Sequence, residues 1–136
     1  TYTEKNSDFT FTLTCPKNVS ITADKKRIEQ VITNLLNNAI NYSKDQKEIN
    51  IRLKKVPNKS QYKLEIVDHG IGISKENLAH VFDRHFRSTS AKRTTVGSGI
   101  GLSIVKSILN HYNFEFGVTS TENKGSTFFV VFQTNK

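Results

Sequence analysis

Four amide side chains recur at helical spacing near the start of the chain, which places them on one face of an α-helix. They are Gln30, Asn34, Asn38 and Asn41, separated by four, four and three residues. Asparagine is a poor helix former, and Lys or Glu would serve a merely solvated face better. An amide oxygen is a hard, neutral ligand suited to Mg²⁺ that phosphate oxygens already neutralise. The stripe therefore indicates a metal–phosphate site, with a solvated helix face as the alternative.

Two glycine-containing segments have the composition of ligand-binding loops. In residues 68–73 (Asp-His-Gly-Ile-Gly-Ile) the glycines let the backbone approach a flat ligand, and the Asp68 carboxylate can accept a hydrogen bond from an exocyclic amine. By itself this segment could equally be a tight turn after an edge strand. Residues 97–102 (Gly-Ser-Gly-Ile-Gly-Leu) open a helix, where free backbone N–H groups and the positive helix end would face an anion. The sequence has neither the dinucleotide-binding glycine pattern nor a GxxxxGK[ST] phosphate loop.

The residues that carry this chemistry lie at the ends of well-marked helices and strands. Apolar residues at spacings of three and four predict a helix over residues 25–42, with Asp24 as its N-cap. A short helix after the Ser74 cap and a helix over residues 102–112 follow, and most of residues 68–101 resembles a long functional loop. Alternation of apolar and polar residues predicts strands at 9–13, 18–22, 48–54, 61–67, 114–119 and 127–133. The sum is an α+β fold with helices packed on one face of a sheet.

Composition places the chain among globular domains and leaves its partners open. Its 136 residues fit one compact domain, and the single Cys15 can form no internal disulfide. No apolar run approaches the roughly 20 residues needed to span a bilayer, so we expect a soluble segment. A net charge of +8 attracts polyanions in general, from nucleic acid to the phosphate tail of a nucleotide.

Taken together and in order, these segments strongly resemble the ATP-binding domain of histidine kinases, over nearly the whole chain. That domain belongs to a wider family with gyrase B, the ninety-kilodalton heat-shock chaperones and MutL. Residues 27–43 resemble the family's N box, residues 68–73 its first glycine box, residues 81–87 its F box and residues 97–102 its second glycine box. The N-box match is very specific, and the four together leave little room for coincidence.

The resemblance implies a Bergerat fold, which is a two-layer α/β sandwich with a mixed sheet of about five strands and three helices on one face. Nucleotide would lie between the helices and a mobile lid, so ATP and Mg²⁺ are the implied ligands. The whole chain, residues 1–136, would be the single ATP-binding catalytic domain of a histidine kinase. The phosphate-accepting dimerisation domain would be absent from this segment.

The resemblance also assigns roles to individual residues. Asn38 would ligate Mg²⁺, and the catalytic residues would be Asn34, beside the metal, and Arg87, which would reach the triphosphate from the lid. Asp68 would bond the adenine amine, with Tyr42 flanking the base. The residues expected to bind ATP are Asn38, Asn41, Tyr42, Asp68, Gly70, Gly72, Ile73, Phe82, Arg87, Lys92, Gly97, Gly99, Ile100, Gly101, Leu102, Ser126 and Thr127. In this set Gly70 and Gly72 would admit the adenine ring, while Ser126 and Thr127 would close the adenine side.

Three places depart from the usual family pattern. Asn41 stands where many of these kinases carry a Lys that touches phosphate. His85 and Phe86 replace the more usual Phe and Tyr, and Asn123 occupies the usual first glycine of the final box. None of these changes removes the metal ligand or the adenine carboxylate, so we expect nucleotide binding with an altered affinity.

The implied function is transfer of the γ-phosphoryl group of Mg-ATP to a histidine. ATPases of the wider family carry a Glu four residues before the metal-binding Asn, where it activates water. This chain has Asn34 at that place, and an amide cannot accept the proton. Transfer to a partner side chain is therefore favoured over hydrolysis. The alternatives are an ATPase or serine kinase relative and a nucleotide-sensing pseudokinase.

The resemblance also implies partners and a location. They are the histidine-bearing dimerisation domain of the same parent kinase and a response regulator downstream. We expect no nucleic-acid partner, because the Lys residues are spread over loops and strands rather than forming basic stripes with interleaved aromatics. The isolated domain is expected to be monomeric. It would lie on the cytoplasmic side, in a parent protein anchored in the cell membrane.

Overall fold

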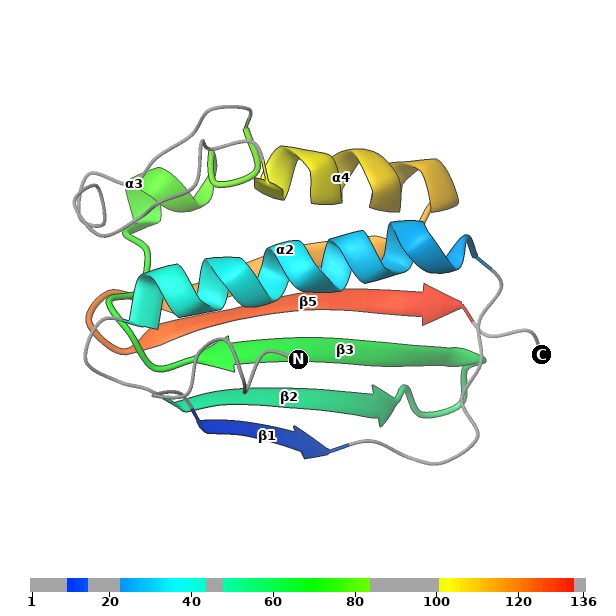
Figure 1. Ribbon diagram of the computed structural model, residues 1–136, viewed down its shortest axis with the longest axis horizontal. Coiled ribbons are helices and arrows are strands. Elements are labelled where there is room, and N and C mark those ends of the chain that lie inside the picture. Colours follow the sequence, from blue (N-terminus) through cyan, green and yellow to red (C-terminus); the bar gives the residue numbers. More distant parts are fainter. Residues whose placement is uncertain (1–9, 15–22, 44–47, 84–100, 134–136) are drawn as a thin grey trace.

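In the computed structural model, the described part of the chain forms a layer of three helices over a five-stranded sheet (Figure 1). The structure describes residues 10–14, 23–43, 48–83 and 101–133. Within these residues no helix is long and apolar enough to cross a membrane. The expected two-layer α+β sandwich is confirmed.

The sheet is mixed, with the strand order β1-β2-β3-β5-β4. β1 pairs with β2 in parallel, and every other neighbouring pair is antiparallel. The strands are β1 (Thr10–Thr14), β2 (Glu48–Lys55), β3 (Gln61–Asp68), β4 (Glu115–Thr121) and β5 (Gly125–Gln133). The expected hairpin of β2 and β3 is confirmed, and Asn58 in its turn takes the left-handed conformation that asparagine tolerates, at φ 63°. The strand expected at residues 18–22 lies outside the described residues.

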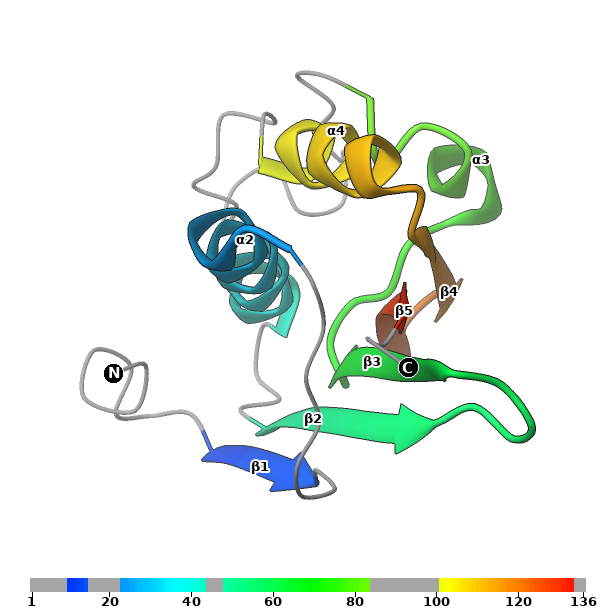
Figure 2. The ribbon, with the colours of Figure 1, turned by 90° about the vertical axis from the view of Figure 1, so that its right-hand side faces the viewer.

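The helices are α2 (Lys25–Ser43), α3 (Lys75–Leu78) and α4 (Gly101–Tyr112), and all lie on one face of the sheet (Figure 2). α2 begins where expected, since the Asp24 carboxylate accepts a hydrogen bond from Lys26 N at 2.9 Å. Ser74 caps α3 in the same way, with Asn77 N donating to its hydroxyl at 3.3 Å. α4 ends at Asn113, another left-handed asparagine, with φ 59°.

The core lies between the helices and the sheet, because one face of each strand and one stripe of each long helix are apolar. Val31 and Leu35 of α2 and Leu109 of α4 are fully buried against it. From the sheet, Ile66 of β3 and Phe128 of β5 are at most 1% exposed. This packing fixes the end of β3 beneath the end of α2, where the candidate site lies.

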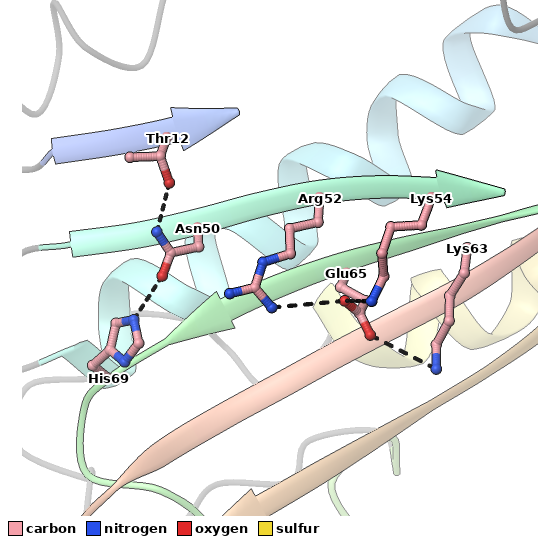
Figure 3. Close-up of polar contacts among 7 residues, drawn as sticks. All are labelled: Thr12, Asn50, Arg52, Lys54, Lys63, Glu65 and His69. Atoms are coloured by element: carbon pink, nitrogen blue, oxygen red, sulfur yellow. Dashed lines mark hydrogen bonds and ion pairs between the residues drawn. The ribbon is translucent and has the colours of Figure 1, made fainter. Parts of the chain in front are cut away.

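The opposite face of the sheet carries a group of polar and charged side chains (Figure 3). There Glu65 of β3 forms ion pairs with three cations, whose Nη1 or Nζ atoms lie 3.1 to 3.9 Å from its carboxylate. The cations are Arg52, Lys54 and Lys63. His69 Nε2 lies 2.7 Å from Asn50 Oδ1, which ties this histidine to the same face.

Candidate functional site

Asp68 is a buried carboxylate at the end of β3, with only 1% of its surface exposed. Its Oδ1 accepts a hydrogen bond from Gly70 N at 3.0 Å, whereas Oδ2 is buried and has no hydrogen-bond partner among the described residues. Burial raises the pKa of Asp68 to about 6, although the N–H groups of Gly70 and Ser126 and the nearby His69 oppose the rise. A buried acceptor without a partner is costly, so Oδ2 marks a place for a ligand that donates a hydrogen bond.

Tyr42, in the last turn of α2, lies next to this carboxylate. Its pKa is raised by burial and, to a smaller extent, by the negative charge of Asp68. Its backbone carbonyl accepts a hydrogen bond from Ile71 N at 3.0 Å. The end of α2 and the loop after β3 are thereby held together around Asp68.

The glycines of this loop are needed for close approach of backbone to backbone. A Cβ atom at Gly70 would overlap the carbonyl oxygen of Tyr42. Gly72 has φ +72°, and a Cβ there would overlap the carbonyl oxygen of Thr121. The expectation that these two glycines admit an adenine ring stays a prediction, and both also let the loop pack closely against the end of α2 and the turn between β4 and β5.

That turn is itself closed by two special residues. Gly125 has φ +124°, and a Cβ atom there would overlap the carbonyl oxygen of Asp68. Asn123 has φ 69° and donates from its N–H to Ile71 O at 2.7 Å. Asparagine tolerates this conformation better than most residues. The departure from glycine at position 123 is therefore compatible with the local backbone.

The amide stripe of α2 is half-buried, at the boundary between the core and solvent. Gln30, Asn34, Asn38 and Asn41 are all partly covered, while Glu29, Thr33 and Asn37 on the neighbouring stripe are exposed. The amide stripe is therefore not the solvated face of the helix. Asn38 Nδ2 is buried and has no hydrogen-bond partner among the described residues.

Asn34 connects the stripe to the start of α4. Its Nδ2 donates to Gly101 O at 3.3 Å. A Cβ atom at Gly101 would lie 3.7 Å from the Asn34 side chain, which is ordinary contact. Leu102, the next residue, packs against the core and anchors this end of α4.

Three other expected site residues lie in different surroundings: on the helix side of the sheet, on its opposite face, and in the core. Ser126 of β5 is 3% exposed and faces the helices beside its register partner Asp68. Thr127 follows it, and because side chains alternate along a strand, its side chain turns to the open face, away from the Asp68 carboxylate. Phe82 packs edge-on against Phe116 and Phe128, with ring centroids 5.2 and 6.0 Å away, so it belongs to an aromatic core cluster.

Several expected site residues lie outside the described part of the chain. They are Arg87, Lys92, Gly97, Gly99 and Ile100. Conversely, sequence reasoning missed Ser120 of β4, whose hydroxyl accepts a hydrogen bond from Ile73 N at 2.7 Å. Ile73 itself is 2% exposed, and that bond to its N–H holds the loop after β3. The only sequence signal for Ser120 is a polar residue at an inward position of a strand.

The site has the donor set for a metal that arrives with phosphate. In the described residues no group of three or more His, Cys, Asp or Glu side chains could hold a metal ion. Magnesium is normally held by one or two protein oxygens together with phosphate oxygens and waters. The Asn38 side chain is half-buried and its Nδ2 has no hydrogen-bond partner among the described residues, so no described contact of Nδ2 opposes reorientation of the amide toward such an ion.

Known proteins resemble this chain in sequence. The family described as "Histidine kinase-, DNA gyrase B-, and HSP90-like ATPase" matches residues 23–136. The phosphate regulon sensor protein PhoR of Haemophilus influenzae is 34% identical over 88% of this chain, and the histidine-protein kinase ArlS of Staphylococcus haemolyticus is 36% identical over 86%. The chain spans 29% and 26% of the lengths of these two relatives.

A solved structure of a sensor histidine kinase has a similar fold. The mycobacterial sensor histidine kinase MprB superposes with a TM-score of 0.86 and 28% identity, covering 97% of this chain and 88% of that one. The chain belongs to the histidine kinase-, DNA gyrase B- and HSP90-like ATPase family, as an ATP-binding catalytic domain of the sensor histidine kinase type.

Proposed function

We propose that this domain binds Mg-ATP and donates the γ-phosphoryl group to a histidine on a separate dimerisation domain of its parent two-component sensor kinase. The observation that carries the proposal is the unpartnered Oδ2 of buried Asp68, beside Tyr42 and at one end of the half-buried amide stripe. One end of the site thus has an acceptor for a base, and α2 leads from there toward metal-binding amides.

At the base end, Asp68 Oδ2 accepts a hydrogen bond from the exocyclic amine of adenine. The carboxylate suits this role because Oδ1 is already held by Gly70 N, which fixes its orientation. Gly70 and Gly72 contribute by allowing the loop to lie against α2 and the β4–β5 turn. Ser126, next to Asp68, lines the same end of the site.

At the phosphate end, Asn38 and Asn34 lie on the stripe of α2 that faces the start of α4. Asn38 would supply a neutral oxygen to Mg²⁺, and the bound ion would offset the negative charge of the phosphates. Asn34 holds the carbonyl of Gly101 and so positions the first turn of α4, whose N-terminal amides are oriented for an anion. By resemblance to the family, Arg87, Lys92 and the amides of residues 97–102 complete the phosphate contacts.

Transfer to a side chain is favoured over hydrolysis by the residue types in the stripe. Phosphoryl transfer depends mainly on positioning and on stabilising charge. The nearest amide to Gly101, Asn34, cannot take a proton from water, and general-base catalysis is typically worth about 10² to 10⁴ in rate. The bare domain therefore holds the donor and turns over slowly until a histidine is presented.

The partners and location follow from the same proposal. The phosphate acceptor is the histidine-bearing dimerisation domain of the parent, which passes the phosphoryl group to a response regulator. The domain, residues 1–136, is monomeric by itself and lies on the cytoplasmic side, while the parent is anchored in the cell membrane. The two relatives are named as a sensor protein and a signal transduction histidine-protein kinase, and both are several times longer than this chain, which supports a parent protein with further domains.

A reconstitution experiment tests the proposal. The chain is mixed with the histidine-bearing dimerisation domain of its parent and with radiolabelled Mg-ATP. We expect a phosphoryl group on the partner that is labile to acid and stable to base, and we expect Asp68→Asn to reduce its formation. Brisk hydrolysis by the bare chain would indicate an ATPase relative. Acid-stable phosphoserine would indicate a serine kinase, and ATP binding without any transfer a nucleotide-sensing pseudokinase.

A further inference from the structure

Ser120 of β4 lies in the same lateral row of the sheet as Asp68. The strand register pairs Ser120 with Ser126, and Ser126 with Asp68. The Ser120 hydroxyl oxygen lies 2.7 Å from Ile73 N, 2.9 Å from Gly125 O and 2.8 Å from Ser126 Oγ. One hydroxyl therefore joins the loop after β3 to the β4–β5 hairpin.

The donors and acceptors around this hydroxyl determine which way each bond runs. A serine hydroxyl has one proton and two acceptor lone pairs. The N–H of Ile73 can only donate and the carbonyl of Gly125 can only accept, so all three contacts are satisfied together when the Ser120 proton goes to Gly125. Towards Ser126, Ser120 can then only accept. Ser126 must donate its single proton to Ser120, and only lone pairs remain on Ser126 for any other partner.

We propose that Ser120 is a positioning residue which holds the Ser126 hydroxyl as an acceptor, and thereby makes the base site prefer a 6-amino purine to a 6-oxo purine. The inference rests on the proposed function, since it concerns the same base site. Ionised Asp68 also offers only lone pairs, through its unpartnered Oδ2. Two neighbouring acceptors suit an exocyclic amine, which has two N–H donors, and they repel an exocyclic carbonyl.

Removal of the Ser120 hydroxyl frees the proton of Ser126. In Ser120→Ala the Ser126 O–H loses its acceptor and can rotate to donate toward the base. A donor beside Asp68 accommodates the carbonyl of a 6-oxo purine, because one repulsive contact becomes a hydrogen bond. The preference for a 6-amino purine over a 6-oxo purine then becomes smaller, although Ser120 itself does not touch the base.

The test measures the Kd of ADP and of inosine diphosphate, which differ in the group at C6 and in the proton at N1, by calorimetry in the presence of Mg²⁺. The readout is the Kd of inosine diphosphate divided by the Kd of ADP, which is large when the site prefers the 6-amino purine. We expect Ser120→Ala to lower the ratio about fivefold relative to the unmodified chain, the effect of one neutral hydrogen bond. In a Ser126→Ala background, Ser120→Ala should leave the ratio unchanged, because the hydroxyl through which it acts is gone. Thr119→Ala, on the open face beside Ser120, is the matched control and should also leave it unchanged.

A purely structural role for Ser120 predicts a different result. In that case Ser120→Ala would weaken both nucleotides equally, and the unchanged ratio would overturn the inference. A change in ratio that persists in the Ser126→Ala background would overturn it as well. If Ser120→Ala does not fold, Ser120→Cys keeps the size but bonds weakly, and an unchanged ratio there has the same meaning. Failure of the unmodified chain to bind ADP would instead contradict the proposed function, so the two failures are distinguishable.

Discussion

Asn34 Nδ2 donates to the carbonyl oxygen of Gly101 at 3.3 Å, and this bond links the amide stripe of α2 to the first residue of α4. The two residues are far apart in sequence, and their contact joins the amide stripe of α2 to the N-terminus of α4. A donor is required at Asn34 for this contact, because a carbonyl can only accept. A Glu at this position, as in hydrolysing relatives, would lack that donor.

The first prediction concerns Asn34→Ala. Loss of the contact with Gly101 should leave the affinity for Mg-ADP within about threefold, because neither residue holds the base. The rate of transfer to the dimerisation domain should fall by about tenfold or more, since a small displacement of the phosphates from the in-line geometry costs rate. Single-turnover phosphorylation measures the rate, and calorimetry measures the affinity. Equal losses in both would show that Asn34 acts in ground-state binding.

The second prediction concerns stability and pH. Burial raises the pKa of Asp68 from its ordinary value of 3.8 to about 6 in the folded chain, so the folded state holds this proton more tightly. The contribution of the neutral carboxyl to the free energy of unfolding is complete below about pH 4. As the pH rises from about 4 to about 6, the free energy of unfolding should fall by about 3 kcal/mol. Urea unfolding of the unmodified chain and of Asp68→Asn at several pH values isolates this contribution. As the pH rises from 4 to 6.5, the unmodified chain should lose stability relative to Asp68→Asn. A difference in unfolding free energy that stays constant with pH would contradict the prediction.

The third prediction concerns nucleotide affinity and pH. An amine that donates to Asp68 stabilises the ionised form, so binding must lower the pKa of this group. The affinity for ADP should therefore rise from pH 5 to pH 7, by up to about tenfold per unit below the pKa. Asp68→Asn should weaken binding at pH 7 by about tenfold to a hundredfold. It should also lose the part of the pH dependence due to Asp68, while retaining the part due to the phosphates of ADP.

The sequence was most informative where a pattern repeats along one element. The helix expected at residues 25–42 is α2 at Lys25–Ser43, because apolar residues at three and four leave no other period. Asp68 was placed correctly at the end of a strand for a similar reason. The parallel pairing of β1 with β2 was not foreseen, since alternation within a strand does not specify its neighbour.

Contacts between distant segments account for the remaining differences. The role of Gly70 at the adenine ring stays a prediction, and the structure adds that a Cβ atom there would overlap the backbone of Tyr42, which is 28 residues earlier in the chain. The resemblance assigns both Ser126 and Thr127 to the adenine side, and strand alternation places their side chains on opposite faces of the sheet. Ser120 carries no local motif, and its importance depends on Ile73 and Gly125 meeting at one hydroxyl.

The fourth prediction compares two glycines. Gly125→Ala should destabilise the domain severely, by about 3 kcal/mol or more, because φ +124° is unfavourable for alanine and its Cβ would overlap Asp68 O. Gly101→Ala is the matched control: its Cβ meets Asn34 at 3.7 Å, and alanine favours the helix that begins there. Thermal unfolding should show a large loss of Tm for Gly125→Ala and little change for Gly101→Ala. Similar melting temperatures for the two variants would contradict the backbone packing at the β4–β5 turn.

The fifth prediction separates stability from metal binding at Asn38. Its Nδ2 is buried without a hydrogen-bond partner among the described residues, and asparagine is a poorer helix former than alanine. Asn38→Ala should therefore leave the nucleotide-free domain at least as stable as the unmodified chain. It should also remove most of the gain in ADP affinity that Mg²⁺ provides, because the amide oxygen is lost as a ligand.

The Mg²⁺ gain is the ratio of the Kd for ADP in EDTA to the Kd in Mg²⁺, and two controls test its origin. Asn110→Ala makes the same exchange at an exposed position of α4, so it changes helix propensity in the same way as Asn38→Ala. Because Asn38 is still present in this variant, the Mg²⁺ gain should be unchanged. Asp68→Asn should weaken ADP binding with and without metal by the same factor, because it alters the base end of the site. If Asn38→Ala kept the full Mg²⁺ gain, the metal would have to be held by phosphate and other residues. If Asp68→Asn reduced the gain, the base and metal ends would be coupled rather than separate.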